Sequence, residues 1–141
     1  MALAFYTSFA EDLADAGLDW VADDLRLALM TNTYAFSAAH AFRAALTNEI
    51  ATGNGYTTGG LALDTKTATA ANPCVMTAAD EVVAQNAAGF TTARKYTLLK
   101  WVGTAATDPL IANGTAVADF GNQAGQLTLD YPASFLTITL A

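Results

Sequence analysis

The chain has few of the residues that build metal centres and disulfide frameworks. Its 141 residues include one cysteine, Cys74, and one histidine, His40. A lone cysteine can form no internal disulfide and no cysteine-based metal site. We therefore expect no disulfide, no metal and no other cofactor, and a reducing compartment suits such a chain.

Charged residues are also scarce, at 13% of the chain, which is about half of the usual ~25%. The net charge is −7, from 6 basic and 13 acidic residues, and the basic residues form no cluster larger than Arg94-Lys95. Nucleic acids and anionic lipid surfaces attract clustered positive charge. We therefore expect the protein to bind neither of them.

Long apolar runs are missing as well. No stretch reaches the roughly 18 apolar residues of a membrane-spanning helix, and the opening MALAFYTSFA has no basic region before Glu11. We expect neither a membrane span nor a signal peptide. We see no linker or repeat, so the sequence predicts a single β-rich domain over 1–141, with an N-terminal helical segment over 1–17.

What the chain does have is a glycine-rich stretch, Gly53-Asn54-Gly55-Tyr56-Thr57-Thr58-Gly59-Gly60. Glycine allows backbone conformations with positive φ, and Asn-Gly is the strongest two-residue turn signal. The stretch predicts a tight turn, a fixed Tyr56, a second bend at Gly59-Gly60, and then a strand from Leu61.

Alternating apolar residues predict several strands. Leu25, Leu27 and Leu29 share one parity and should face a core. The other expected strands or extended segments cover 61–69, 74–76, 90–102, 109–112, 117–120, 126–131 and 136–140. Short strands separated by frequent turns are typical of a mainly β fold, here an antiparallel β-sandwich or barrel-like domain.

Three segments have other expectations. Phe5, Phe9 and Leu13 recur at helical spacing, so we expect a helix within 5–16 that Gly17 terminates. Thr77 to Asp80 resembles a capping box and favours a helical turn through Val83. The alanine-rich segment 34–46 is compatible with either a helix or an ordered loop.

A second Asn-Gly pair, Asn113-Gly114, lies between the apolar segments 109–112 and 117–120. This arrangement is typical of a two-residue hairpin. We therefore expect two short strands here, joined by a turn.

Several side chains are candidates for catalytic or binding roles. The glycine stretch lacks the third glycine and following helix of a dinucleotide fingerprint. His40 has no serine in a nucleophile elbow to activate, since the serines are Ser8, Ser37 and Ser134. Cys74 lies in an apolar run typical of a packed side chain. We expect no catalytic residue among them.

The remaining candidates are acids and aromatics. Six acids between Glu11 and Asp24 lack the spacing of a calcium-binding loop and suggest a solvated helix face. Trp20, Trp101, Tyr56 and Tyr96 could form a sugar-stacking platform, although aromatics at strand and turn positions more often fill a core or an interface. A carbohydrate-binding module stays open as an alternative.

The order of the segments resembles one known family. Asp24-Leu25-Arg26-Leu27-Ala28-Leu29-Met30 is followed by Tyr34, His40 and Glu49, then by the glycine stretch with its GxGYTxGG pattern and Leu63. Later come the 93–101 strand, Pro109-Leu110-Ile111, Asp119-Phe120-Gly121 and Gly125-Gln126-Leu127-Thr128-Leu129. This succession, over most of 17–140, resembles small virion structural proteins of tailed bacteriophages.

The resemblance implies a protein without enzymatic activity, assembled in the bacterial cytoplasm and located in the virion. The role that it implies first is a head decoration or cement protein that contacts the major capsid protein or other virion proteins. A tail, neck or fibre-attachment role is the alternative. The resemblance also implies that Tyr56, Gly59, Gly60, Phe120 and Gly121 hold the fold. As a hypothesis from lattice symmetry, we expect a small cyclic homo-oligomer, for instance a trimer.

Overall fold

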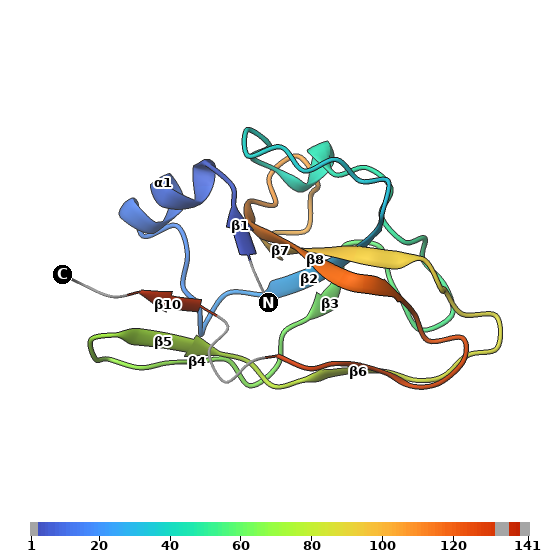
Figure 1. The fold of residues 1–141 in the computed structure, drawn as a ribbon. Coiled ribbons are helices and arrows are strands. Elements are labelled where there is room, and N and C mark those ends of the chain that lie inside the picture. Colours follow the sequence, from blue (N-terminus) through green and yellow to red (C-terminus); the bar gives the residue numbers. More distant parts are fainter. Residues whose placement is uncertain (1–2, 132–135, 139–141) are drawn as a thin grey trace.

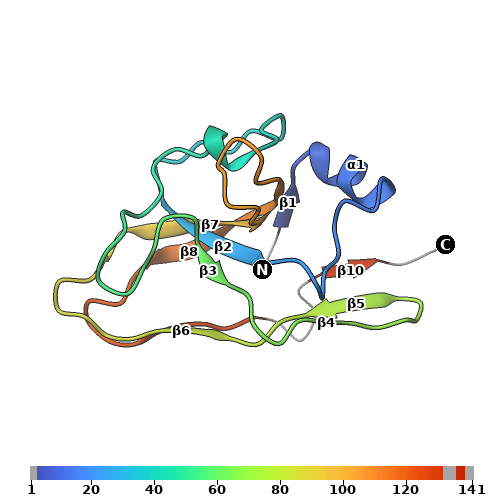
Figure 2. The ribbon, with the colours of Figure 1, turned by 180° about the vertical axis from the view of Figure 1, so that it is seen from behind.

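A computed structural model describes residues 3–131 and 136–138, and it shows a mainly β protein (Figure 1). A five-stranded antiparallel sheet, in the order β1-β8-β7-β2-β3, lies in the middle of the molecule. Figures 1 and 2 show smaller strand groups below this sheet and α1 with ordered loops above it. The predicted mainly β, sandwich-like fold is confirmed.

The bounds of the elements are as follows. The strands are β1 (Leu3–Phe5), β2 (Leu25–Thr31), β3 (Leu61–Ala62), β4 (Thr67–Ala68), β5 (Cys74–Thr77), β6 (Glu81–Val83), β7 (Ala93–Lys100), β8 (Leu110–Phe120), β9 (Leu127–Leu129) and β10 (Leu136–Ile138). The helices are α1 (Ser8–Ala14) and a 3-10 turn over Arg43–Ala45.

The central strand β2 buries side chains on both faces of the sheet. Leu25, Leu27 and Leu29 pack into a core that the smaller sheets cover, as their shared parity predicts. Ala28 and Met30, which point the opposite way, pack into a second core with Tyr6, Tyr34 and Leu99. The sheet is therefore the middle layer of the domain, and the loop around Tyr34 covers its upper face.

The lower layer consists of two small groups of strands. One group has the order β10-β5-β4, and the other pairs β6 with β9. Met76 of β5 and Val83 of β6 are buried, and Met76 packs in the same core as the leucines of β2. The expected strands at 74–76 and within 126–131 are confirmed, and the extended segment 61–69 contains the two short strands β3 and β4.

The N-terminal segment differs from the expected helix in its bounds. The first described residues, Leu3–Phe5, form the edge strand β1, which pairs with β8 through Leu3 opposite Gly114. The helix begins at Ser8 and ends at Ala14, and Phe9 is its buried residue. Gly17 does not terminate it in a left-handed conformation, because that conformation falls on Ala16, with φ of 52°.

The helical turn expected through Val83 is wrong. Residues 81–83 form β6, which pairs antiparallel with β9 through Val83 opposite Leu127. The Asp80 carboxylate accepts a hydrogen bond from the backbone N–H of Tyr131 at 2.8 Å and does not cap a helix. Pairing with a strand about 45 residues later outweighs the local capping signal.

The hairpin expected at Asn113-Gly114 is also wrong, since both residues lie inside the continuous strand β8. The Asn113 amide donates to the carbonyl of Tyr96 at 3.0 Å and to the Thr97 hydroxyl at 2.8 Å on β7. β8, with 11 residues, is longer than β7, with 8. The strand expected over 90–102 is present as β7, which covers only Ala93–Lys100.

The glycine-rich turn has the expected form. Gly53 and Tyr56 exchange backbone hydrogen bonds of 2.8 and 3.1 Å around Asn54-Gly55. Asn54 and Gly55 have φ of 55° and 93°, as a type I′ turn requires. Gly59 and Gly60 also have positive φ, and β3 follows at once.

Residues 34–46 form an ordered loop with one 3-10 turn, which settles the choice left open by their composition. The closing strand is present as β10, Leu136–Ile138. The rest of the expected strand, 139–140, lies outside the described residues.

Candidate interaction surface

Asp108 is the centre of a hydrogen-bond network between the end of β7 and the start of β8. Its side chain is fully buried. The oxygen Oδ1 accepts hydrogen bonds from the backbone N–H groups of Val102, Gly103 and Thr104 at 2.7, 3.0 and 3.2 Å. The oxygen Oδ2 accepts one from Arg43 Nε at 2.7 Å. This network fixes the loop after β7 to the 3-10 turn of the upper layer.

The environment of Asp108 favours its charged form. Burial by itself would raise the pKa of this carboxyl group. The hydrogen bonds from Arg43, Val102 and Thr104, together with the charge of Arg43, outweigh burial and lower the pKa below its ordinary value. Asp108 is therefore ionised at neutral pH, and its ion pair with Arg43 holds the two segments together.

Trp101 follows β7 and lies beside two arginines. The guanidinium carbons of Arg26 and Arg43 are 4.0 and 4.5 Å from the centre of its ring. Arg26 is oriented by Asp24, whose carboxylate accepts its Nη2 hydrogen bond at 2.7 Å. Cations over an indole ring are attracted by its electron-rich face, so the ring and both guanidinium groups are held in fixed positions.

Gly59 of the glycine-rich turn packs directly against this ring. A Cβ atom at this position would lie 2.3 Å from Cζ3 of Trp101, and Gly59 has φ of 104°. A side chain here would both strain the backbone and displace the indole. The glycine is therefore required for Trp101 to lie where it does.

Two exposed apolar residues are the chain neighbours of Arg43 and Trp101. Phe42 is 45% exposed, and Val102 is 58% exposed. Phe42 forms a β-bridge with Pro109, and Val102 donates to Asp108, so both backbones are fixed by the same network. We call Arg26, Phe42, Arg43, Trp101 and Val102 the Trp101 surface. Tryptophan, phenylalanine and arginine are enriched in protein interfaces.

The other residues that carry the family resemblance support the fold. The Tyr56 hydroxyl donates to Glu49 Oε1 at 2.7 Å, and the N–H of Gly59 donates to the same oxygen at 2.6 Å. Gly60 and Gly121 pack against backbone atoms of Leu27 and Phe90 at distances that leave no room for a side chain.

Among the described residues, no candidate nucleophile has a side-chain hydrogen bond to His40. His40 is half-buried in the upper layer, with its Nδ1 atom 3.5 Å from the Tyr34 hydroxyl. Cys74 packs against the core of the lower layer, on the other side of the large sheet. Ser37 is linked to His40 through its backbone carbonyl, and Ser8 begins α1. Ser134 lies outside the described residues.

The acids near the N-terminus make local contacts. Asp19 Oδ1 accepts the backbone N–H groups of Val21 and Ala22, both at 3.0 Å, and Asp23 pairs with Lys100 at 2.9 Å. Within residues 3–131 and 136–138, no group of three histidine, cysteine, aspartate or glutamate side chains is placed to hold a metal ion.

The four aromatic residues that could form a sugar-stacking platform are dispersed. Trp20 is 4% exposed and donates its indole N–H to the carbonyl of Thr77 at 3.0 Å in the lower layer. Trp101 lies under its two arginines, while Tyr56 and Tyr96 are buried in the core. The four rings therefore offer no common exposed face for a sugar.

Sequence reasoning identified Trp101 and the glycine stretch but missed Asp108, Arg43 and Phe42. These residues come from segments that are far apart in the chain, and no local spacing signals their contact.

In the described part of the chain, no helix is long and apolar enough to span a membrane. Comparison of the chain with protein-family models, curated proteins and solved structures finds no match.

Proposed function

We propose that the protein is a structural component of a tailed-bacteriophage virion, without enzymatic activity. In this role it is a head decoration or cement protein that binds the major capsid protein and stabilises the head. A tail, neck or fibre-attachment position is the alternative within the same class. The Trp101 surface is the part of the molecule that would contact the neighbouring protein.

One observation carries this proposal: two of the segments that resemble the virion family contribute Arg26 and Trp101 to the Trp101 surface. Arg26 and Trp101 lie in two of these segments, and Gly59 of the GxGYTxGG turn determines the position of the indole ring. Pro109, from a third segment, pairs with the exposed Phe42. The pattern behind the resemblance therefore places aromatic and arginine side chains together at the surface.

The rigid support of this surface suits repeated contact within a lattice. The Asp108 network and the glycine turn hold its backbone in place, so little conformational entropy would be lost on binding. Weak contacts that are repeated by symmetry add up to strong attachment. We further propose that the protein is a small cyclic homo-oligomer such as a trimer, because closed symmetry is typical of such assemblies.

Cryo-electron microscopy of particles with and without the protein tests the proposal. We expect density for the protein on the outer face of the head, with the Trp101 surface against the major capsid protein. Density at the tail or neck would favour the alternative position, and absence of the protein from purified particles would refute a virion role. Light scattering of the purified protein gives its oligomeric state.

Two variants test whether the Trp101 surface makes the contact with the neighbouring virion protein. Phe42→Ser and Val102→Ser each remove an exposed apolar side chain, and we expect roughly tenfold weaker binding to particles for a central contact. Val82→Ser is the matched control, since Val82 is 56% exposed on β6 of the lower layer. Equal binding by all three variants would exclude this surface as the contact.

A further inference from the structure

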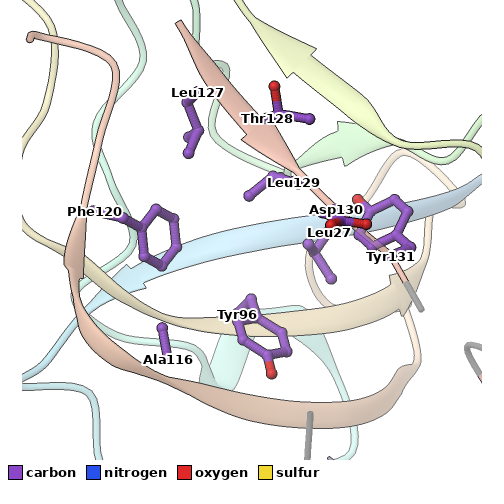
Figure 3. A pocket seen from close by; sticks show the side chains of 9 residues that line it. All are labelled: Leu27, Tyr96, Ala116, Phe120, Leu127, Thr128, Leu129, Asp130 and Tyr131. Carbon is purple, nitrogen blue, oxygen red and sulfur yellow. The ribbon is translucent and has the colours of Figure 1, made fainter. Parts of the chain in front are cut away.

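A groove opens between the large sheet and β9, away from the Trp101 surface. Its walls include Leu27 of β2, Tyr96 of β7, Phe120 of β8, and Leu129 and Tyr131 on the other side. Figure 3 shows Phe120, Leu129 and Tyr96 around the same open space. We call it the Leu129 groove.

The groove is apolar and large enough for one ring. Its volume is about 220 Å³, whereas an apolar cavity of roughly 150 Å³ accepts benzene. Three of its lining residues are aromatic, and ring pairs gain interaction energy beyond that of their buried area. An aromatic group therefore suits the groove better than an aliphatic group of the same size.

Phe120, Leu127 and Leu129 are only partly buried, although they pack against the main core. Their remaining apolar surface faces the groove and contacts water. An occupant would remove that surface from water, which favours binding in proportion to the apolar area buried. The groove is therefore an incompletely filled part of the sandwich that a side chain from outside can complete.

The rim of the groove carries negative charge. Asp130 lines the groove and is exposed. Asp80 and Glu81 lie close enough to the Tyr131 wall to act on its hydroxyl electrostatically. The cation Arg94 is already paired with Asp119 at 3.3 Å. A positive group beside the aromatic ring would thus find an attractive field at the rim.

We propose that the Leu129 groove binds an aromatic side chain that a partner protein presents next to a lysine or arginine. The ring fills the space between Leu129, Phe120 and Tyr96, and the neighbouring cation pairs with Asp130. This proposal goes beyond the virion role and does not depend on it, because the groove and its charge belong to the chain itself.

Short peptides test the proposal on the whole purified protein. The probe is N-acetyl-Tyr-Lys-amide, followed by two-dimensional NMR of the backbone amides. We expect saturable shifts at residues 96, 120 and 127–131. N-acetyl-Tyr-Glu-amide keeps the ring and reverses the charge, while N-acetyl-Ala-Lys-amide keeps the charge and removes the ring, so both should bind more weakly.

Variants separate the two parts of the site. Leu129→Trp fills the groove from its own wall and should abolish binding of the Tyr-Lys peptide. Asp130→Asn leaves the groove open and should weaken that peptide by roughly threefold to fivefold, as expected for an exposed ion pair. Asp15→Asn is the charge-matched control, since Asp15 is exposed at the end of α1, and it should bind as the wild type does.

Three results would overturn the proposal. The first is no saturable shift with the Tyr-Lys peptide, and the second is equal binding of the Tyr-Lys and Ala-Lys peptides. The third is an Asp130→Asn variant that still prefers the Tyr-Lys peptide over the Tyr-Glu peptide as strongly as the wild type does. Because Asp130 is exposed, this variant retains the fold and decides the question even if Leu129→Trp does not fold.

Discussion

The Tyr56 hydroxyl accepts a hydrogen bond of 2.9 Å from the backbone N–H of Leu29, at a point of β2 that β3 does not reach. The Leu29 carbonyl accepts the N–H of Ile50 at 2.8 Å on the same side. The Tyr56 side chain therefore hydrogen-bonds to the edge of β2 where a neighbouring strand would otherwise pair. This relationship explains why the turn needs a tyrosine rather than another aromatic residue.

Tyr56→Phe should destabilise the protein by about 1–3 kcal/mol, because it leaves the buried Leu29 N–H without its acceptor. The matched variant is Tyr96→Phe. The Tyr96 hydroxyl is buried, and no described residue hydrogen-bonds to it, so its removal should leave stability unchanged or raise it. Urea unfolding of both variants measures the difference, and equal losses would contradict this account of Tyr56.

The two Asn-Gly pairs of the chain show how much of the fold could be predicted from the sequence. Asn54-Gly55 and Asn113-Gly114 both favour a two-residue turn, yet one is a turn and the other lies inside β8. The first pair is closed by contacts with its immediate neighbours Gly53 and Tyr56. The second is set by contacts with β7, which lies 16 or more residues away. The local sequence therefore predicted the turn at Asn54-Gly55 correctly. It carries no information on the contacts with β7 that place Asn113-Gly114 inside a strand.

The same reason limited the prediction of the surfaces. Alternation along β2 and β9 predicted strands correctly, because a strand's own parity records which side is buried. The Trp101 surface and the Leu129 groove are each assembled from several distant segments. The sequence shows these aromatic, arginine and leucine residues as separate positions. Which of them contact one another depends on how the strands pair.

Gly114→Ala should destabilise the protein through overpacking. A Cβ atom at Gly114 would lie 2.2 Å from Cε2 and Cζ of the Tyr96 ring, so the ring would have to leave its place in the core. We expect a loss of about 1–3 kcal/mol in the free energy of unfolding. Gly125→Ala is the control, since nothing lies within 4 Å of its Cβ position. A similar small effect of both substitutions would rule out this packing.

Ala16→Gly should stabilise the protein. Ala16 has φ of 52°, a conformation that costs an ordinary residue about 1–2 kcal/mol and glycine very little. The greater freedom of glycine in the unfolded chain offsets about 0.4–1 kcal/mol of that gain, so we expect a net increase of roughly 0.5–1 kcal/mol. Thermal unfolding measures it.

The control for Ala16 is Ala10→Gly, at an exposed position within α1. Glycine in a helix interior is about 1 kcal/mol less favourable than alanine, so this variant should lose stability. If both glycine variants shift the unfolding temperature in the same direction, the left-handed conformation at Ala16 is not the cause.

The Arg43–Asp108 pair should make stability depend on pH. The folded pKa of Asp108 lies below its unfolded value of about 3.9. The pair therefore contributes its full stabilisation above that value and loses it as the pH falls through the folded pKa. Asp108→Asn removes this contribution and leaves Arg43 without its buried partner, which typically costs about 3–5 kcal/mol at neutral pH.

Urea unfolding of the wild type and Asp108→Asn, from about pH 7 down to about pH 3, measures this dependence. The stability difference between the two proteins should be constant down to roughly pH 5 and should narrow below pH ~4, where Asp108 takes up a proton in the unfolded wild type while it stays charged in the folded one. Asp24→Asn is the control, because Asp24 is 42% exposed in its pair with Arg26 and should change stability by less than about 1 kcal/mol. A difference for Asp108→Asn that stays constant to the lowest pH would mean that packing, and not the charge of Asp108, holds the loop after β7 in place.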